Sequence, residues 1–281
     1  MQRFAKPLIG CALVAGLVIA TGPIPACGAS QPSEVVETLL RAMAGEVRDA
    51  EDRVALEQLI AVFSGHGTVR AEREGPWVEL TFNREGELEA VAIQAERLVS
   101  APPLIQRAVI LHELAHLQRA KATRRALNNL PQPTIRERSG SDQQQPLDAA
   151  QRLREIVRIL VDDEYQAYRR EIKYLEGAVN TAGGLRRYLT TLPPAQRRLT
   201  QEYYQRSVQP FVTAQGDLDE LRLRRDLIFL KTFPRRYRRY YEAALAWEAL
   251  QGHVEIQRSL DGTLRPARLL SPTAFLAWLV P

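Results

Sequence analysis

Two histidines and a glutamate stand at a spacing that can build a metal centre, in the stretch His112-Glu113-Leu114-Ala115-His116. Residues four apart on an α-helix lie one turn above each other on the same face, so both imidazoles can point at one metal ion. Imidazole nitrogen is a preferred ligand of zinc, and a carboxylate beside that face can take a proton from a metal-activated water. The pattern therefore predicts His112 and His116 as metal ligands and Glu113 as a general base.

The neighbouring residues predict that this motif lies on a buried helix. The run Ala108–Leu117 is apolar apart from the motif itself, and Pro102 and Pro103 after Ser100 are typical of a helix start. Two histidines and a glutamate are costly in a buried segment unless a partner such as a metal ion binds them. The chain has only 4 histidines, which argues against a surface helix that carries two of them by chance.

In these residues the chain resembles the zincin metallopeptidases, which carry the His-Glu-x-x-His pattern. No His-x-x-Gly-x-x-His continuation follows His116, so the resemblance points away from the metzincin branch and toward the gluzincins, which take a glutamate from a later helix. It implies Glu164 as the third zinc ligand, within the predicted helix 161–174. The small Ala167 would let two helices approach closely there. Asp163 is the first alternative ligand and Glu171 the second.

The competing interpretation of Glu164 is a solvated carboxylate paired with Arg169 or Arg170 on an arginine-rich helix. One turn after the glutamate, gluzincins often carry an aspartate that supports a zinc-bound histidine, and this chain has Tyr168. The phenol of Tyr168 is expected to hydrogen-bond a ligand or to stabilise an oxyanion. Tyr165 is the alternative for that role.

His253 and Gln118 are two further residues to compare with the zincin pattern. His253 would be a transition-state donor in the style of some gluzincins, although a lone histidine after a glycine and before a strand-like run is more often structural. Gln118 stands where the stricter zincin pattern has a hydrophobic residue.

The first 26 residues have the marks of a signal peptide: a basic start, an apolar run from Leu8 to Ala20, and small residues near a cleavage point. That run is too short for a comfortable membrane span. Ile24-Pro-Ala-Cys27 resembles a bacterial lipobox, which implies membrane attachment through a lipidated Cys27; simple secretion is the alternative. We therefore expect a protein of the cell envelope, either periplasmic or lipid-anchored.

Charge adds little to the functional assignment. The formal net charge is +5, which would suit anionic envelope polymers but also follows from an arginine-rich composition alone. The tract 233–241 mixes arginines with aromatic residues, as nucleic-acid binders do. Because it begins a predicted helix in an exported chain, a solvated helix face is the better interpretation, and no nucleic-acid partner is expected.

The periodicity of the chain predicts an α+β fold that is mostly helical. Residues 32–63 read as one or two amphipathic helices, and 77–82 and 88–93 as a β-hairpin before the zinc helix. The polar, proline-rich segment 130–146 reads as a loop. Four helices follow, over the region of Glu164 to Glu176 and over 195–208, 218–229 and 236–250. A last hairpin turns at Asp261-Gly262.

We thus expect a signal peptide over 1–26, a zincin-like core over 27–180, and a helical part over 181–281 that either stands apart or belongs to the same domain. The expected function is a zinc-dependent metallopeptidase of the bacterial cell envelope, which hydrolyses a polypeptide with a zinc-activated water. The alternatives are a non-catalytic zinc-binding envelope lipoprotein acting in assembly or as a chaperone, and a helical lipoprotein in which the motif is accidental. Because zinc binding alone does not require Glu113, the motif favours the enzyme.

Overall fold

The computed structural model describes residues 31–71, 76–130, 144–213, 215–229, 235–258 and 264–271. The described residues from Pro32 onward belong to one compact unit. The predicted signal peptide and Cys27 lie outside the described residues. As the sequence predicts, the described part is mostly helical with a small sheet. Among the described residues, no helix is both long and apolar enough to cross a membrane.

The first half of the fold places a small sheet before a long helix. Its elements are α1 (Pro32–Glu46), α2 (Ala50–His66), β1 (Thr68–Val69), β2 (Val78–Phe82), β3 (Leu88–Ile93), α3 (Ala95–Ser100) and α4 (Pro103–Asn128). The predicted hairpin is confirmed: β3 pairs antiparallel with β2 and parallel with β1, so β3 is central and β2 lies at an edge. The residues 32–63 form two helices, because Asp49 caps the start of α2 with its side chain.

The turn of this hairpin packs tightly against α4. Gly86 has a φ of +84°, and a Cβ at this position would lie 2.8 Å from the carbonyl oxygen of Ala120. Only glycine combines that backbone conformation with so close an approach. Asn83 closes the turn, since its side-chain oxygen accepts hydrogen bonds from the backbone N–H groups of Glu85 and Glu87. The turn thereby fixes the hairpin on the helix that carries the histidines.

The second half is built on one long helix. Its elements are α5 (Gln144–Thr181), α6 (Leu185–Thr191), α7 (Pro194–Ser207), η1 (Gln209–Phe211), α8 (Glu220–Phe229), α9 (Arg235–Leu250), β4 (Val254–Arg258) and β5 (Leu264–Leu269). The strands β4 and β5 pair antiparallel, as the last predicted hairpin requires. Its turn residues, Asp261 and Gly262, lie outside the described residues.

Two sequence expectations need correction here, and one helix was not expected. The helix that carries Glu164 begins at Gln144 and continues to Thr181, so the last residues of the expected loop 130–146 are helical, while 131–143 lie outside the described residues. The helix expected from Leu218 begins at Glu220, because Leu218 forms a β-bridge with Val212 and the Asp219 side chain accepts a hydrogen bond from the first turn of α8. The short helix α6 was not predicted.

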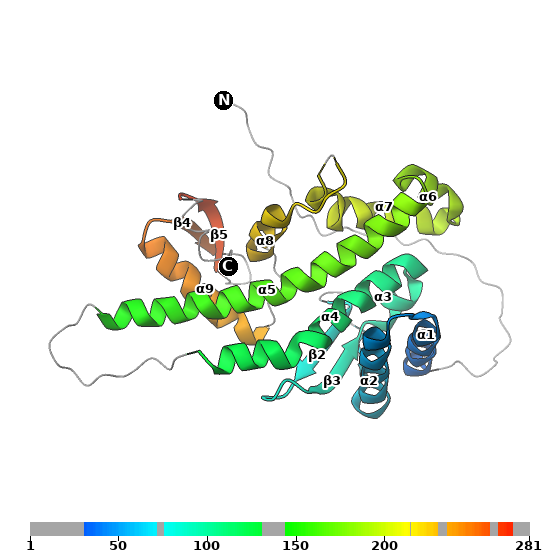
Figure 1. Ribbon diagram of the computed structural model, residues 1–281, viewed down its shortest axis with the longest axis horizontal. Coiled ribbons are helices and arrows are strands. Elements are labelled where there is room, and N and C mark those ends of the chain that lie inside the picture. The colour runs from blue at the N-terminus through cyan, green and yellow to red at the C-terminus, as the bar shows by residue number, and fades with distance from the viewer. Residues whose placement is uncertain are drawn as a thin grey trace. The chain divides into compact units, whose positions relative to one another are not determined.

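Helices α4 and α5 lie side by side and are the most extensively packed pair of the fold (Figure 1). One apolar cluster joins α4 to α1, α2, α3 and the sheet. A second joins the start of α4 to α5, α7, α8 and α9. Elements after residue 180 therefore pack on the same helix that carries Glu164.

Candidate metal centre

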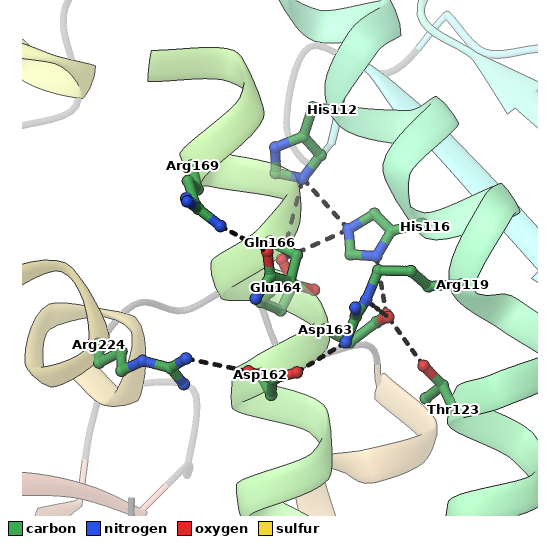
Figure 2. A network of polar contacts seen from close by, with 10 residues as sticks. All are labelled: His112, His116, Arg119, Thr123, Asp162, Asp163, Glu164, Gln166, Arg169 and Arg224. Carbon is green, nitrogen blue, oxygen red and sulfur yellow. Dashed lines mark hydrogen bonds and ion pairs between the residues drawn. The ribbon is translucent and has the colours of Figure 1, made fainter. Parts of the chain in front are cut away.

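Three ligand atoms from α4 and α5 converge on one point (Figure 2). The Nε2 atoms of His112 and His116 are 3.2 Å apart, and Oε2 of Glu164 lies 3.9 Å from the first and 3.6 Å from the second. A point equidistant from the three atoms lies about 2.1 Å from each, a usual bond length from zinc to nitrogen and oxygen ligands. The arrangement could therefore hold one metal ion.

The other nitrogen of each imidazole is bound to a carboxylate of α5. Nδ1 of His112 lies 3.0 Å from Oε2 of Glu171, and Nδ1 of His116 lies 2.8 Å from Oδ2 of Asp163. Asp163 and Glu171, the alternatives for the third ligand, thus lie behind the imidazoles rather than among the converging atoms. A carboxylate at Nδ1 holds the proton on that nitrogen, which leaves the Nε2 lone pair directed at the shared point.

Asp163 is itself held from α4. Its Oδ1 accepts a hydrogen bond from Thr123 Oγ1 at 2.9 Å and lies 3.5 Å from Nε of Arg119. Arg119 also donates to the neighbouring Asp162 at 2.6 Å, and Arg224 of α8 donates to the same carboxylate at 3.0 Å. These contacts hold the part of α5 directly before Glu164 against α4 and α8 (Figure 2).

Glu171 is held from a third helix. The hydroxyl of Tyr203, on α7, donates to Oε1 of Glu171 at 2.7 Å. Both oxygens of the Glu171 carboxylate are therefore bound by protein groups, and the residue is only 3 % exposed. Sequence reasoning missed Tyr203, because it lies far along the chain from Glu171 and no local pattern around it indicates a role.

The carboxylates also change the acid–base behaviour of the histidines. Burial, the largest influence, lowers the pKa of His112, but the hydrogen bond to Glu171 and nearby negative charge outweigh it and raise the pKa above its usual value. For His116, burial again acts downward, yet the charge of Glu164 and the bond to Asp163 raise the pKa well above its usual range. The metal-free site therefore attracts positive charge.

Glu113 lies half-buried beside the two histidines. Burial raises the pKa of its carboxyl to about 7, although the charges of His112 and His116 act in the opposite direction. A bound cation would add to that opposing effect and favour the ionised carboxylate. Glu113 is therefore a carboxyl group whose proton affinity suits exchange with water near neutral pH.

The two tyrosines proposed from sequence face different surroundings. The ring of Tyr168 lies edge-on to the imidazole of His112, with the ring centroids 4.5 Å apart. Tyr165 is fully buried in the second apolar cluster, and the guanidinium of Arg224 lies over its ring at 3.8 Å. The structure thus brings Tyr168 to the histidines and packs Tyr165 toward α8.

The arginines expected to pair with Glu164 are engaged elsewhere. Arg170 forms an ion pair with Asp52 of α2 and donates to the side-chain oxygen of Gln118 at 2.8 Å. Gln118 in turn donates to Asp52 at 2.9 Å, so the polar residue that departs from the zincin pattern ties α4 to α2 and α5. Arg169 lies 3.5 Å from the side-chain oxygen of Gln166.

His253 belongs to a different cluster. Its Nδ1 lies 2.7 Å from Oε2 of Glu248, and Arg154 donates to the other oxygen of that glutamate at 2.7 Å. Among the described residues His253 joins no group of three ligand side chains. The structure therefore pairs it with Glu248 rather than with the converging residues of α4 and α5.

The geometry of the converging atoms favours a cation between them. With each Nδ1 protonated toward its carboxylate, the two Nε2 lone pairs face each other at 3.2 Å beside the Glu164 oxygen. Such a cluster is repulsive unless a proton or a metal ion lies within it. The side chains of the three residues are 12 to 15 % exposed.

Comparison with models of protein families, with curated proteins and with solved structures finds no match to this chain. We therefore infer the function from the residues and geometry of the candidate centre.

Proposed function

We propose that this protein is a zinc-dependent metallopeptidase that uses an activated water to hydrolyse peptide bonds. The observation that carries the proposal is the convergence of His112, His116 and Glu164, with Glu113 beside them on the same helix as the histidines. Three protein ligands leave a position for water and substrate, which is the arrangement of catalytic rather than structural zinc sites.

The donor set supports zinc over the harder ions magnesium and calcium. Two neutral imidazoles and one carboxylate suit zinc, whereas magnesium and calcium prefer oxygen ligands throughout. Zinc bound there would polarise both a water molecule and the carbonyl of the scissile bond. The Nδ1 contacts of Asp163 and Glu171 support this assignment, because they orient both imidazoles for metal binding.

Glu113 is proposed to move the proton. Its carboxylate accepts a proton from the attacking water and then donates it to the amine of the leaving peptide. The pKa of about 7 in the metal-free protein supports this role, since burial makes the carboxylate a better base than an exposed glutamate.

Tyr168 is proposed to stabilise the negative charge that develops on the carbonyl oxygen of the scissile bond. Its ring packs against His112, and it lies one turn after Glu164 on α5, so it borders the ligand that α5 contributes. A phenol at such a place can donate a hydrogen bond to an oxyanion.

An extended polypeptide is the proposed substrate. The strand β2 lies at the edge of its sheet and packs on α4, so its free edge can pair with a peptide backbone close to the histidine helix. The resemblance to zincins supports the same use of this strand. The proposed location is the cell envelope, on the signal-peptide pattern of residues 1–26 and the lipobox-like Cys27.

Elemental analysis of the purified mature protein, beside its Glu113→Gln variant, tests this proposal. Each protein is also assayed on an unstructured protein such as casein. We expect about one zinc ion in both proteins and hydrolysis in the unaltered protein alone, because the amide cannot accept the proton of the water. Zinc without turnover in the unaltered protein would favour the non-catalytic envelope protein, and equal turnover in both would overturn the role of Glu113.

A further inference from the structure

The hydrogen bonds at Glu171 connect the metal centre to the part of the chain beyond residue 180. His112 on α4, Glu171 on α5 and Tyr203 on α7 form one continuous chain of side-chain contacts of 3.0 and 2.7 Å. We propose that Tyr203 is a positioning residue, which acts through Glu171 to fix the orientation of His112. This inference rests on the proposed metal centre.

The carboxylate of Glu171 needs a second donor to stay in place. It is buried, and one of its oxygens is used by the imidazole of His112. The Tyr203 hydroxyl occupies the other oxygen, so the carboxylate cannot rotate away from His112 without losing a hydrogen bond in a poorly solvated place. The phenol stays neutral, because burial and the charge of Glu171 raise the pKa of Tyr203 well above its usual value.

Tyr203 is in turn fixed by the region that precedes β2. Its ring meets the ring of Trp77 edge-on, with centroids 6.0 Å apart, and Arg97 lies over Trp77 at 4.9 Å from the centroid. An aromatic contact of this kind limits rotation of the phenol. The orientation of His112 thus depends on α7 and on the entrance to β2, in addition to the two helices that carry the ligands.

The chain offers a matched control at the next position. The hydroxyl of Tyr204 also bonds a glutamate of α5, Glu176, in a contact of the same type. The residues that contact Glu176 include Asn180 of the same helix, and Glu176 lies more than one helical turn beyond Glu171. Loss of either hydroxyl removes one phenol–carboxylate bond, but only Tyr203 lies on the path to a metal ligand.

The test measures zinc dissociation constants by competition with a chelator at one fixed pH, and the visible absorption of the cobalt(II)-substituted protein. Tyr203→Phe should weaken zinc binding about 10-fold and change the cobalt absorption, because His112 loses its fixed orientation. Tyr204→Phe should leave both measurements unchanged, although thermal stability falls by a similar amount in the two variants. Equal zinc affinity in both variants and the unaltered protein would overturn the inference.

A second variant keeps the inference testable should Tyr203→Phe not fold. In Glu171→Gln the side-chain oxygen can accept from only one of the two donors, so zinc binding should weaken at least as much. Adding Tyr203→Phe to Glu171→Gln should then cost nothing further, because the hydroxyl acts only through the carboxylate. Unchanged zinc affinity in Glu171→Gln, or additive losses in the double variant, would contradict it. Absence of zinc from the unaltered protein would instead contradict the proposed function itself.

Discussion

Two clusters in this molecule pair histidine with a buried carboxylate, and only one of them resembles a metal centre. At the end of α9, His253 and Arg154 share the two oxygens of Glu248, which is 1 % exposed. Between α4 and α5, His112 and His116 each hold a carboxylate at Nδ1, as His253 does. A histidine bound to a carboxylate is therefore not sufficient to indicate a metal ligand.

The difference lies at the other imidazole nitrogen and in the charge balance. Arg154 neutralises Glu248, so that cluster is complete without a cation. Among the described residues no arginine pairs with Glu164 or Glu171, and both Nε2 atoms of the α4 histidines face the Glu164 oxygen. The α4–α5 cluster thus combines excess negative charge with convergent lone pairs, which is what a divalent cation requires.

Removal of the third ligand should produce the largest effect on the α4–α5 cluster. Glu164→Ala leaves two imidazoles, too few protein ligands for a stable catalytic site, so zinc binding should weaken by at least about 10-fold and turnover should disappear. The matched control is Glu155→Ala on the same helix, which loses only an ion pair with Arg158. Chelator competition and the casein assay check both variants. Retained zinc affinity in Glu164→Ala would require a different carboxylate as ligand.

Acid should weaken zinc binding because zinc competes with protons on the histidines. The pKa values of His112 and His116 are raised above 6.5 in the metal-free protein, so each holds its proton to a higher pH than a free histidine. Zinc affinity should therefore fall as the pH decreases through these raised values, by about 10-fold per pH unit for each proton displaced. Zinc titrations at several pH values measure this slope. A zinc affinity that stays constant between about pH 6 and pH 8, the range around the ordinary pKa of histidine, would contradict the assignment of both histidines as ligands.

Loss of an imidazole's carboxylate partner should have a smaller effect than loss of a ligand. Asp163→Asn removes the negative charge at Nδ1 of His116 and should weaken zinc binding by a smaller factor than Glu164→Ala does, about 10-fold at most, without abolishing it. The adjacent Asp162→Asn is the control, since Asp162 contacts Arg119 and Arg224 but neither histidine. If the two variants had the same zinc affinity, the contact between Asp163 and His116 would have no role in metal binding.

A change in the Glu248 cluster should affect stability but not zinc affinity. Glu248→Gln leaves Arg154 and His253 without their shared charge and should lower the free energy of unfolding by about 1–2 kcal/mol, since both partners are partly solvated. Zinc affinity should stay unchanged. Urea unfolding of the zinc-loaded protein and a zinc titration measure the two quantities. A loss of zinc affinity in Glu248→Gln would show that the two clusters are coupled through α5.

Local sequence determined the elements that present the chemistry. The four-residue spacing of His112 and His116, within an apolar helical run, places both on one face of α4 whatever surrounds it. Alternation of apolar and polar residues likewise specified β2 and β3, and Glu164 was selected from its place on a later helix by resemblance to zincins. These features depend on backbone periodicity, which the local order of apolar and polar residues reveals.

Only the tertiary structure decided what lies behind the candidate ligands. Asp163 and Glu164 are adjacent in sequence, yet the rotation of α5 against α4 sends one carboxylate to Nδ1 of His116 and the other toward both Nε2 atoms. Tyr203 reaches Glu171 because α7 packs against α5, a contact between distant segments. Such partners depend on helix rotation and on packing between elements remote in sequence, and no local pattern records either.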